Sequence, residues 1–228
     1  MVYHTTPKIA ERKEARKQRF IQTAVQLFGT HGYAATTVPM IVQESGSSTG
    51  SFYFYFKNKE DVFAAAMEWL GQRIAEALNR AIAAQTNPLL QMRAAVEGFF
   101  LFLAQNPTEA RILLVESSGL GERLEAIRRR LLASHARGVE SALAALGPLL
   151  PPIRPPVAAW CWVGAVYQAV WWWLEQPAES RPPVERIATE VADFNLRAIG
   201  ADPRTLAAAG TAPAVHAARK RPGRKRTP

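Results

Sequence analysis

The segment Thr37–Phe56 limits the fold more than any other part of the chain, because it predicts two short helices joined at a glycine. The first helix is expected over 38–44, where Val38 and Ile41 share an apolar face and a preceding threonine can cap the amino terminus. Gly46 then stands where a tight turn needs backbone angles that other residues adopt reluctantly. The segment therefore predicts a helix-turn-helix geometry.

The second short helix, which Ser48 can cap, begins with small residues and continues with aromatic ones. Small side chains at its amino-terminal end allow the backbone to approach base edges. Phe52 and Phe56 can anchor its inner face, while the hydroxyls of Tyr53 and Tyr55 can hydrogen-bond phosphates. In this interpretation phosphate contacts position the helix and base contacts select the sequence. Packed on a longer preceding helix, the two short helices predict DNA binding.

Helical spacing also dominates the rest of the 228 residues, and no run alternates apolar and polar residues as a half-buried strand would. We therefore expect an all-α fold, in which Gly29 and Gly32 end the first helix. The expected helices cover 8–28, 38–44, 48–56, 60–84, 89–105, 108–117, 121–146, 156–175 and 183–199. The expected domains are a DNA-binding domain over 1–60, a larger helical domain over 61–200 and a basic, disordered tail over 201–228.

Basic residues are concentrated at the two ends of the chain. Residues 1–19 carry a net charge of +4 and residues 200–228 carry +6, whereas the whole chain carries +9. The middle of the chain is therefore nearly neutral. A protein that meets DNA with its amino-terminal part has this distribution, but a solvated tail explains the carboxyl-terminal charge equally well.

The residue order from Thr36-Thr37-Val38 through Glu44-Ser45-Gly46 to Ser48–Glu60 resembles the amino-terminal signature of the tetracycline-repressor (TetR) family. The resemblance covers about residues 14–63. It implies a three-helix DNA-binding domain followed by a larger helical domain for ligand binding and dimerisation. Thr49 departs from a frequent lysine of the family, which leaves the operator sequence open. The DNA-binding residues that the resemblance implies are Thr37, Ser48, Thr49, Gly50, Ser51, Tyr53, Tyr55 and Lys59.

Members of this family pair their last two long helices across a two-fold axis, so the resemblance also implies a homodimer on a palindromic, double-stranded operator. Two apolar stripes in 156–175 and 183–199 suit that arrangement, and a glycine in the first would let helices approach closely. The same stripes can also belong to the core of one chain. The expected interface residues are Gly164, Val184, Ile187, Val191 and Phe194.

A ligand pocket is expected among the middle helices, which carry many aromatic and few polar side chains. Such walls favour a small apolar or aromatic ligand. The expected pocket residues, each of which can instead be ordinary core, are Phe99, Phe102, Leu103, Leu113, Glu116, Trp160, Trp162, Tyr167 and Trp171. The predicted function is that of a ligand-responsive DNA-binding regulator, and the resemblance favours a repressor that ligand releases from its operator.

Two other classes of protein fit parts of the sequence. The uncharged segment Val157–Leu174 is short for a membrane span but has tryptophans at both ends, so a membrane-attached helical protein is one alternative. A helical small-molecule enzyme is the other, although no plausible catalytic pair is found and no enzymatic activity is expected. Four scattered histidines predict no metal site, and no cofactor is expected. A single cysteine, Cys161, suits a reducing, cytoplasmic compartment.

Overall fold

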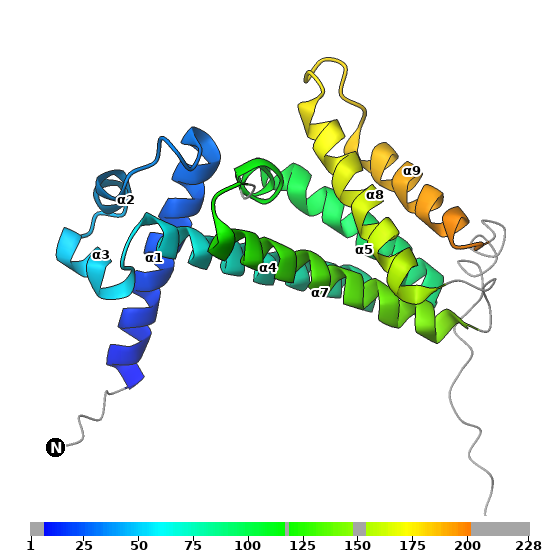
Figure 1. The fold of residues 1–228 in the computed structure, drawn as a ribbon, viewed down its shortest axis with the longest axis horizontal. Helices are drawn as coiled ribbons and strands as arrows, with labels where there is room; N and C mark the ends of the chain where they lie inside the picture. The colour runs from blue at the N-terminus through cyan, green and yellow to red at the C-terminus, as the bar shows by residue number, and fades with distance from the viewer. Residues whose placement is uncertain (1–6, 117–118, 148–153, 202–228) are drawn as a thin grey trace, which may run out of the picture.

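A computed structural model describes residues 7–116, 119–147 and 154–201. These residues form helices and no strand, which confirms the all-α fold (Figure 1). The helices are α1 (Pro7–His31), α2 (Val38–Glu44), α3 (Thr49–Tyr55), α4 (Lys59–Ala83), α5 (Pro88–Gln105), α6 (Pro107–Arg111), the π-helical turn η1 (Ile112–Glu116), α7 (Glu122–Leu146), α8 (Pro155–Glu175) and α9 (Val184–Ala198). Apart from residue 201, the expected tail lies outside the described residues.

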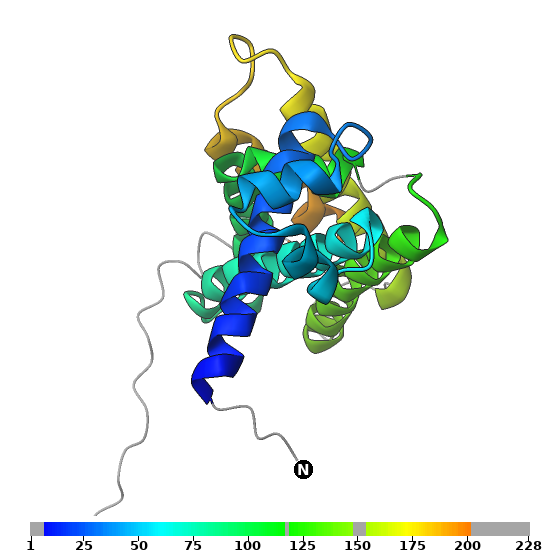
Figure 2. The same cartoon turned by 90° about the vertical axis from the view of Figure 1, so that its left-hand side faces the viewer.

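The molecule has a small part and a larger part that meet along α4 (Figure 1). Helices α1, α2 and α3 form the small part, and Figure 2 shows the amino-terminal end of α1 projecting beyond it. In the larger part α4 packs against α5 and α7, while α5 also packs against α9 and α7 against α8. This is the predicted fold class, with a three-helix amino-terminal group followed by a larger group of helices.

Apolar residues at helical spacing hold the two parts together. The buried face of α4 contains Val62, Phe63, Met67, Leu70 and Ile74. This helix contacts α1 in the small part and both α5 and α7 in the larger part. A continuous cluster of buried apolar residues therefore runs through both parts of the molecule.

The first helix extends further than expected. It continues through Gly29 to His31 and ends at Gly32, whose φ of +86° favours a residue without a side chain. The prediction that Gly29 ends the helix is wrong. A Cβ atom on Gly29 would clash with Cγ2 of Thr108 and lie 2.5 Å from the Thr108 carbonyl oxygen. This glycine instead allows α1 to lie directly against the start of α6.

The helix expected over 108–117 forms two distinct turns, because the backbone widens from α6 into η1. Single π-helical turns of this kind occur frequently at functional sites. The carboxylate of Glu116, the last residue of η1, accepts hydrogen bonds from the backbone N–H of Tyr33 at 2.8 Å and from Arg111 at 3.1 Å. The turn thereby connects the larger part to the loop that follows α1.

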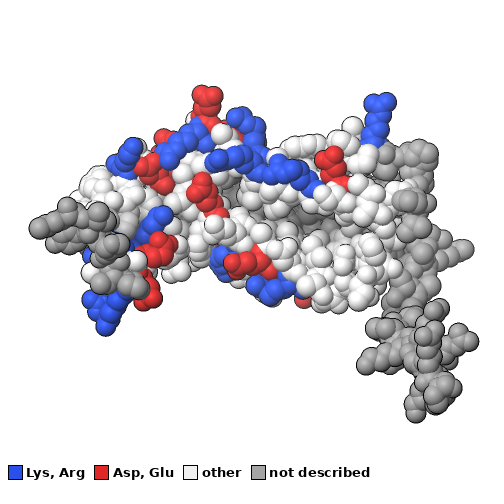
Figure 3. Space-filling model, turned by 90° about the horizontal axis from the view of Figure 1, so that it is seen from below, with Lys and Arg blue, Asp and Glu red and all other residues white. Residues whose placement is uncertain are grey.

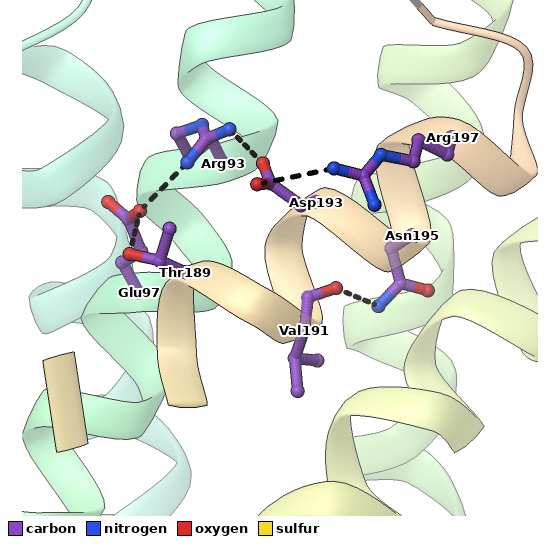
Figure 4. Close-up of polar contacts among 7 residues, drawn as sticks. All are labelled: Arg93, Glu97, Thr189, Val191, Asp193, Asn195 and Arg197. Carbon is purple, nitrogen blue, oxygen red and sulfur yellow. Dashed lines mark hydrogen bonds and ion pairs between the residues drawn. The ribbon is translucent and has the colours of Figure 1, made fainter. Parts of the chain in front are cut away.

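Polar contacts between α5 and α9 set how these helices lie against each other (Figure 4). Arg93 of α5 pairs with Asp193 of α9, and it lies 3.4 Å from Glu97 on its own helix. Thr189 of α9 donates its hydroxyl to Glu97 at 3.3 Å. Partly exposed ion pairs contribute only about 0–1 kcal/mol each. Burial of apolar residues such as Ile187 therefore supplies most of the attraction, and the polar contacts set the register.

We predict that Gly29→Ala lowers the free energy of unfolding by about 1–3 kcal/mol, the range for overpacking a tight contact. The matched control is Gly138→Ala in α7, where an added Cβ meets no atom within 4 Å. The control should keep its stability or gain up to about 1 kcal/mol, because alanine favours helix. Urea unfolding followed by circular dichroism compares the two variants, and equal stability would contradict the close approach of α1 and α6.

Candidate functional site

The turn between α2 and α3 is built as its sequence predicts. The side chain of Thr37 accepts a hydrogen bond from the backbone N–H of Met40 at 3.4 Å, and Ser48 accepts one from Ser51 at 3.2 Å. Gly46 lies between the two helices with a φ of +62°. Both capping residues are exposed. Two capped helices therefore meet at a glycine turn, and their caps face solvent.

An aromatic cluster holds α3 against α1. Phe52 and Phe56 are buried, which confirms their prediction as anchors. The ring of Phe20 on α1 meets both edge-on, with centroids 5.5 Å from Phe52 and 6.3 Å from Phe56. Tyr55 is half-buried beside them, 6.2 Å from Phe20. Edge-to-face pairs contribute about 0.5–1.5 kcal/mol beyond their burial, so this cluster fixes the orientation of α3.

The opposite face of α3 carries Thr49, Gly50, Tyr53 and Phe54. Tyr53 and Phe54 are 54% and 67% exposed, which is high for aromatic side chains. Thr49, Gly50 and Tyr53 were expected at the DNA contact, whereas Phe54 was not. Its position four residues after Gly50 is the signal that assigns it to the same helical face. Ser51 lies half-buried at the edge of this surface.

Lys59 is engaged within the chain. Its ammonium group donates to the carbonyl oxygens of Tyr33 at 2.7 Å and Ala34 at 3.3 Å, and it lies 4.4 Å from the centre of the Tyr33 ring. The backbone N–H of Tyr33 donates to Glu116. Both the N–H and the carbonyl group of Tyr33 are therefore hydrogen-bonded to side chains from other parts of the chain. Lys59 thus holds the loop that precedes α2, a role that differs from the direct phosphate contact implied by the resemblance.

Basic side chains gather at this end of the molecule. Lys8, Arg12, Lys13 and Arg16 are exposed along the amino-terminal half of α1, and the ammonium group of Lys13 lies 5.5 Å from the centre of the Phe54 ring. Figure 3 shows lysine and arginine over the left-hand half and the middle of the molecule, interspersed with aspartate and glutamate, and few charged side chains on the described surface further to the right. The exposed face of α3 therefore lies in a region that attracts a polyanion.

A cavity of about 540 Å³ lies in the larger part, between α4, α5, α7 and α8. Three of the expected pocket residues, Phe99, Trp162 and Tyr167, line it. Among the described residues of its wall, none is Asp, Glu, Lys or Arg. The volume falls within the range of about 300–1,000 Å³ that small-molecule pockets occupy. The cavity is therefore large enough for a small organic molecule.

The remaining expected pocket residues lie elsewhere. Buried core positions away from the cavity wall are occupied by Phe102, Leu103 and Leu113. Trp160 and Trp171 are exposed on the outer side of α8, and Glu116 contacts the loop after α1. Periodicity identifies an apolar helical position, but it does not reveal whether that position faces a cavity, the core or the outside.

A polar pair of residues in the cavity wall was not expected from the sequence. The hydroxyl of Tyr167 lies 2.9 Å from Nδ1 of His135, and the Phe99 ring packs 5.1 Å from that of Tyr167. Burial lowers the pKa of His135 from 6.5 to about 4, and burial also raises the pKa of Tyr167 above its ordinary value of 10.0. Both side chains are therefore uncharged at neutral pH.

The outer face of α8 and α9 is apolar and exposed. Trp160 and Trp172 on α8 and Phe194 on α9 are 50%, 45% and 63% exposed. Gly164 lies one helical turn from Trp160, is itself exposed, and has no atom within 4 Å of an added Cβ. None of the described helices is long and apolar enough to cross a membrane. The face thus combines large apolar side chains with a position that allows close approach of another helix.

Three of the expected interface residues pack instead into the core of their own chain: Val184, Ile187 and Val191. The apolar stripe that they form on α9 is turned toward α5, the helix with which α9 makes its most extensive contact. Only Gly164 and Phe194 of the expected set lie on the exposed outer face described above. An apolar stripe in the sequence of α9 therefore does not reveal whether it packs inside its own chain or remains exposed for a second copy.

Residues 20–66 match the family model described as bacterial regulatory proteins, tetR family. Among curated relatives, the uncharacterized HTH-type transcriptional regulator YerO of Bacillus subtilis (strain 168) is 44% identical over 54 residues, which cover 24% of this chain and 19% of YerO. Two further regulators are matched over 39% and 46% of their lengths. The chain therefore spans less than half the length of each of these relatives.

Solved structures resemble the chain over most of its length. SmeT in its complex with triclosan has a TM-score of 0.69 at 25% identity, covering 81% of this chain and 91% of SmeT. AibR in complex with isovaleryl coenzyme A and operator DNA has a TM-score of 0.64 at 22% identity, covering 78% of this chain and 97% of AibR. At this level of identity the comparison with AibR concerns the fold alone.

The lowered pKa of His135 predicts a pH dependence of stability. The unfolded chain takes up this proton near pH 6.5 and the folded chain only near pH 4, so the free energy of unfolding falls as the pH drops from 6.5 to 4.5. A hydrogen bond from Arg123 lowers the pKa of Asp61 below its ordinary value of 3.8. The stability that Asp61 contributes is therefore lost only at lower pH. Denaturant titrations at several pH values measure this slope.

His135→Phe should flatten the slope between pH 6.5 and 4.5, because it removes the group that titrates there. The matched variant His31→Gln changes an exposed histidine and should retain the slope. An unchanged slope in His135→Phe would contradict the assignment.

Proposed function

We propose that the chain, which belongs to the tetR family of bacterial regulatory proteins, is a ligand-responsive transcriptional regulator that binds operator DNA as a homodimer. The observation that carries this proposal is the exposed face of α3, which the buried aromatic cluster fixes at the basic end of the molecule. The proposed DNA-binding domain is 1–60, and the proposed ligand-binding and dimerisation domain is 61–200. We propose that the protein regulates transcription without catalysing a reaction. We also propose that it does so in the cytoplasm, the compartment of the operator DNA.

In the proposed complex α3 enters the major groove. Thr49, Gly50 and Ser51 are at its amino-terminal end, where short side chains let the backbone approach base edges. Phosphates beside the groove would be contacted by exposed hydroxyl groups and by the half-buried hydroxyl of Tyr55. These phosphate contacts are assigned to Thr37, Ser48, Tyr53 and Tyr55. Lys59 supports the complex indirectly, since it holds the loop that leads into α2.

A homodimer is proposed through the outer face of α8 and α9. Its exposed tryptophans and Phe194 form an apolar surface that a second copy can cover. A glycine inside a helix costs about 1 kcal/mol relative to alanine, and Gly164 meets no atom of its own chain that would require one. Close approach of a helix from the second copy accounts for it. Two-fold symmetry then presents two α3 helices to a palindromic site.

The ligand is proposed to occupy the cavity between α4, α5, α7 and α8. It regulates DNA binding only if it binds two arrangements of the dimer with different affinity. Helix α4 lines the cavity with Ala75 and Leu78 and begins at Lys59, beside the loop before α2. A shift of α4 therefore reaches the small part of the molecule. We propose that the ligand favours the arrangement in which the two α3 helices no longer match the operator, so that the protein acts as a repressor.

Removal of the Tyr53 hydroxyl should weaken DNA binding about tenfold for every sequence, as expected for loss of one hydrogen bond to a charged phosphate. Fluorescence anisotropy with a mixed-sequence duplex compares Tyr53→Phe with the wild-type chain. Ser141→Ala, which removes an exposed hydroxyl from α7, should leave the affinity unchanged. Equal affinity of Tyr53→Phe and the wild-type chain removes the phosphate assignment.

Gly164→Leu should convert the dimer to a monomer without unfolding it, because the added side chain meets open space in one chain and would clash with a second. Sedimentation equilibrium measures the association, and circular dichroism checks the fold. Ala144→Leu adds a similar volume at an exposed position of α7 and should leave the dimer intact. A Gly164→Leu dimer of wild-type strength would place the interface elsewhere.

A further inference from the structure

The wall of the cavity offers no charge to a ligand. Its described residues include no Asp, Glu, Lys or Arg, and its one histidine, His135, is uncharged at neutral pH. Most of the surface comes from apolar groups such as Met92, Val96 and Trp162. A charged ligand group would lose its water there without meeting an opposite charge in the wall, which is strongly unfavourable. The charge of Arg128, which acts on Tyr167 from outside the wall, is already paired with Glu125. The cavity therefore selects against carboxylates and ammonium groups and favours uncharged molecules.

The wall has few polar side chains, and two of them already donate a hydrogen bond to a backbone carbonyl oxygen. The amide nitrogen of Gln91 donates to the carbonyl oxygen of Gln85 at 2.9 Å, and the hydroxyl of Ser134 donates to that of Leu131 at 2.7 Å. Asn79 is exposed, on the solvent side of the cavity. The pair formed by Tyr167 and His135 is thus the polar group best placed to meet a ligand that enters the cavity.

This pair can serve as either donor or acceptor. When Nδ1 of His135 accepts from the Tyr167 hydroxyl, the tyrosine oxygen remains free to accept from a ligand. When Nδ1 carries the proton and donates to the tyrosine oxygen, the Tyr167 hydroxyl can donate to a ligand instead. An uncharged hydroxyl suits both arrangements, and a carbonyl oxygen suits the second. The lowered pKa of His135 keeps the imidazole in the uncharged form that this exchange of roles requires.

Gly138 keeps one side of the cavity open. It lies well inside α7, is exposed, and belongs to the cavity wall. Alanine would be favoured there by about 1 kcal/mol on helix propensity, and its Cβ would meet no atom within 4 Å. Packing within the chain therefore does not require the glycine. Together with the small side chains of Ala75 and Ala142, it leaves room for a molecule to pass between α4 and α7.

We propose that the cavity binds an uncharged, mainly apolar molecule with one hydroxyl or carbonyl group, which hydrogen-bonds to the pair Tyr167–His135 after entry beside Gly138. The inference rests on the proposed function for its consequence at the operator, whereas binding in the cavity is measurable without DNA.

The test is isothermal titration calorimetry of the full chain with three probes of equal chain length: decan-1-ol, decanoate and decylammonium. Decan-1-ol should bind at least tenfold more tightly than either ion at neutral pH. Tyr167→Phe should weaken decan-1-ol binding about three- to tenfold, the effect of one neutral hydrogen bond. Decanoate binding as tightly as the alcohol, or the absence of saturable alcohol binding, overturns the proposal.

A second pair of variants tests the entry beside Gly138. Gly138→Phe fills the opening and should abolish decan-1-ol binding, whereas Ala144→Phe adds a ring to α7 outside the cavity wall and should retain it. Both variants are checked by thermal unfolding. Undiminished binding by Gly138→Phe overturns the entry route. Anisotropy with DNA separates the two proposals, because alcohol binding by a chain that does not bind DNA contradicts the proposed function and leaves the cavity assignment standing.

Discussion

The packing of Phe20 against Phe52 and Phe56 is the contact on which the rest of the account depends. Helix α3 has seven residues, and so short a helix is not stable by itself in water. Its orientation is therefore set by what its buried face touches, and that partner is α1. Because the exposed face lies opposite this contact, the position of α1 determines where Thr49, Gly50 and their neighbours point.

Two contacts join α1 and the loop that follows it to the larger part of the molecule. Gly29 brings α1 against Thr108 at the start of α6, and the Glu116 carboxylate at the end of η1 holds the backbone of Tyr33 from the other side of the loop. Lys59 adds a contact from α4, the helix that also forms part of the cavity wall. The proposed response to ligand therefore passes through a short series of packed helices.

Much of the fold follows from local sequence signals. Helix α2 has the predicted bounds and is capped by Thr37, one of the two threonines that precede it, and Ser48 caps α3 as expected, because these signals act within a few residues. Local signals do not predict three other features: the role of Gly29, the partners of Lys59 and the direction in which the apolar stripe of α9 faces. Each depends on a residue far away in the sequence, such as Thr108 for Gly29. The pocket shows the same limit, since Tyr167 was expected and its partner His135 was not.

Selection of bound duplexes from a random DNA pool by the full chain shows whether the α3 face recognises a DNA sequence and whether two copies of it do so as a symmetric pair. A symmetric dimer should enrich sites that contain two inverted half-sites, with centres separated by about one helical turn, roughly 34–36 Å, or a multiple of it. Recovery of a single asymmetric site, or no enrichment over the starting pool, would contradict it.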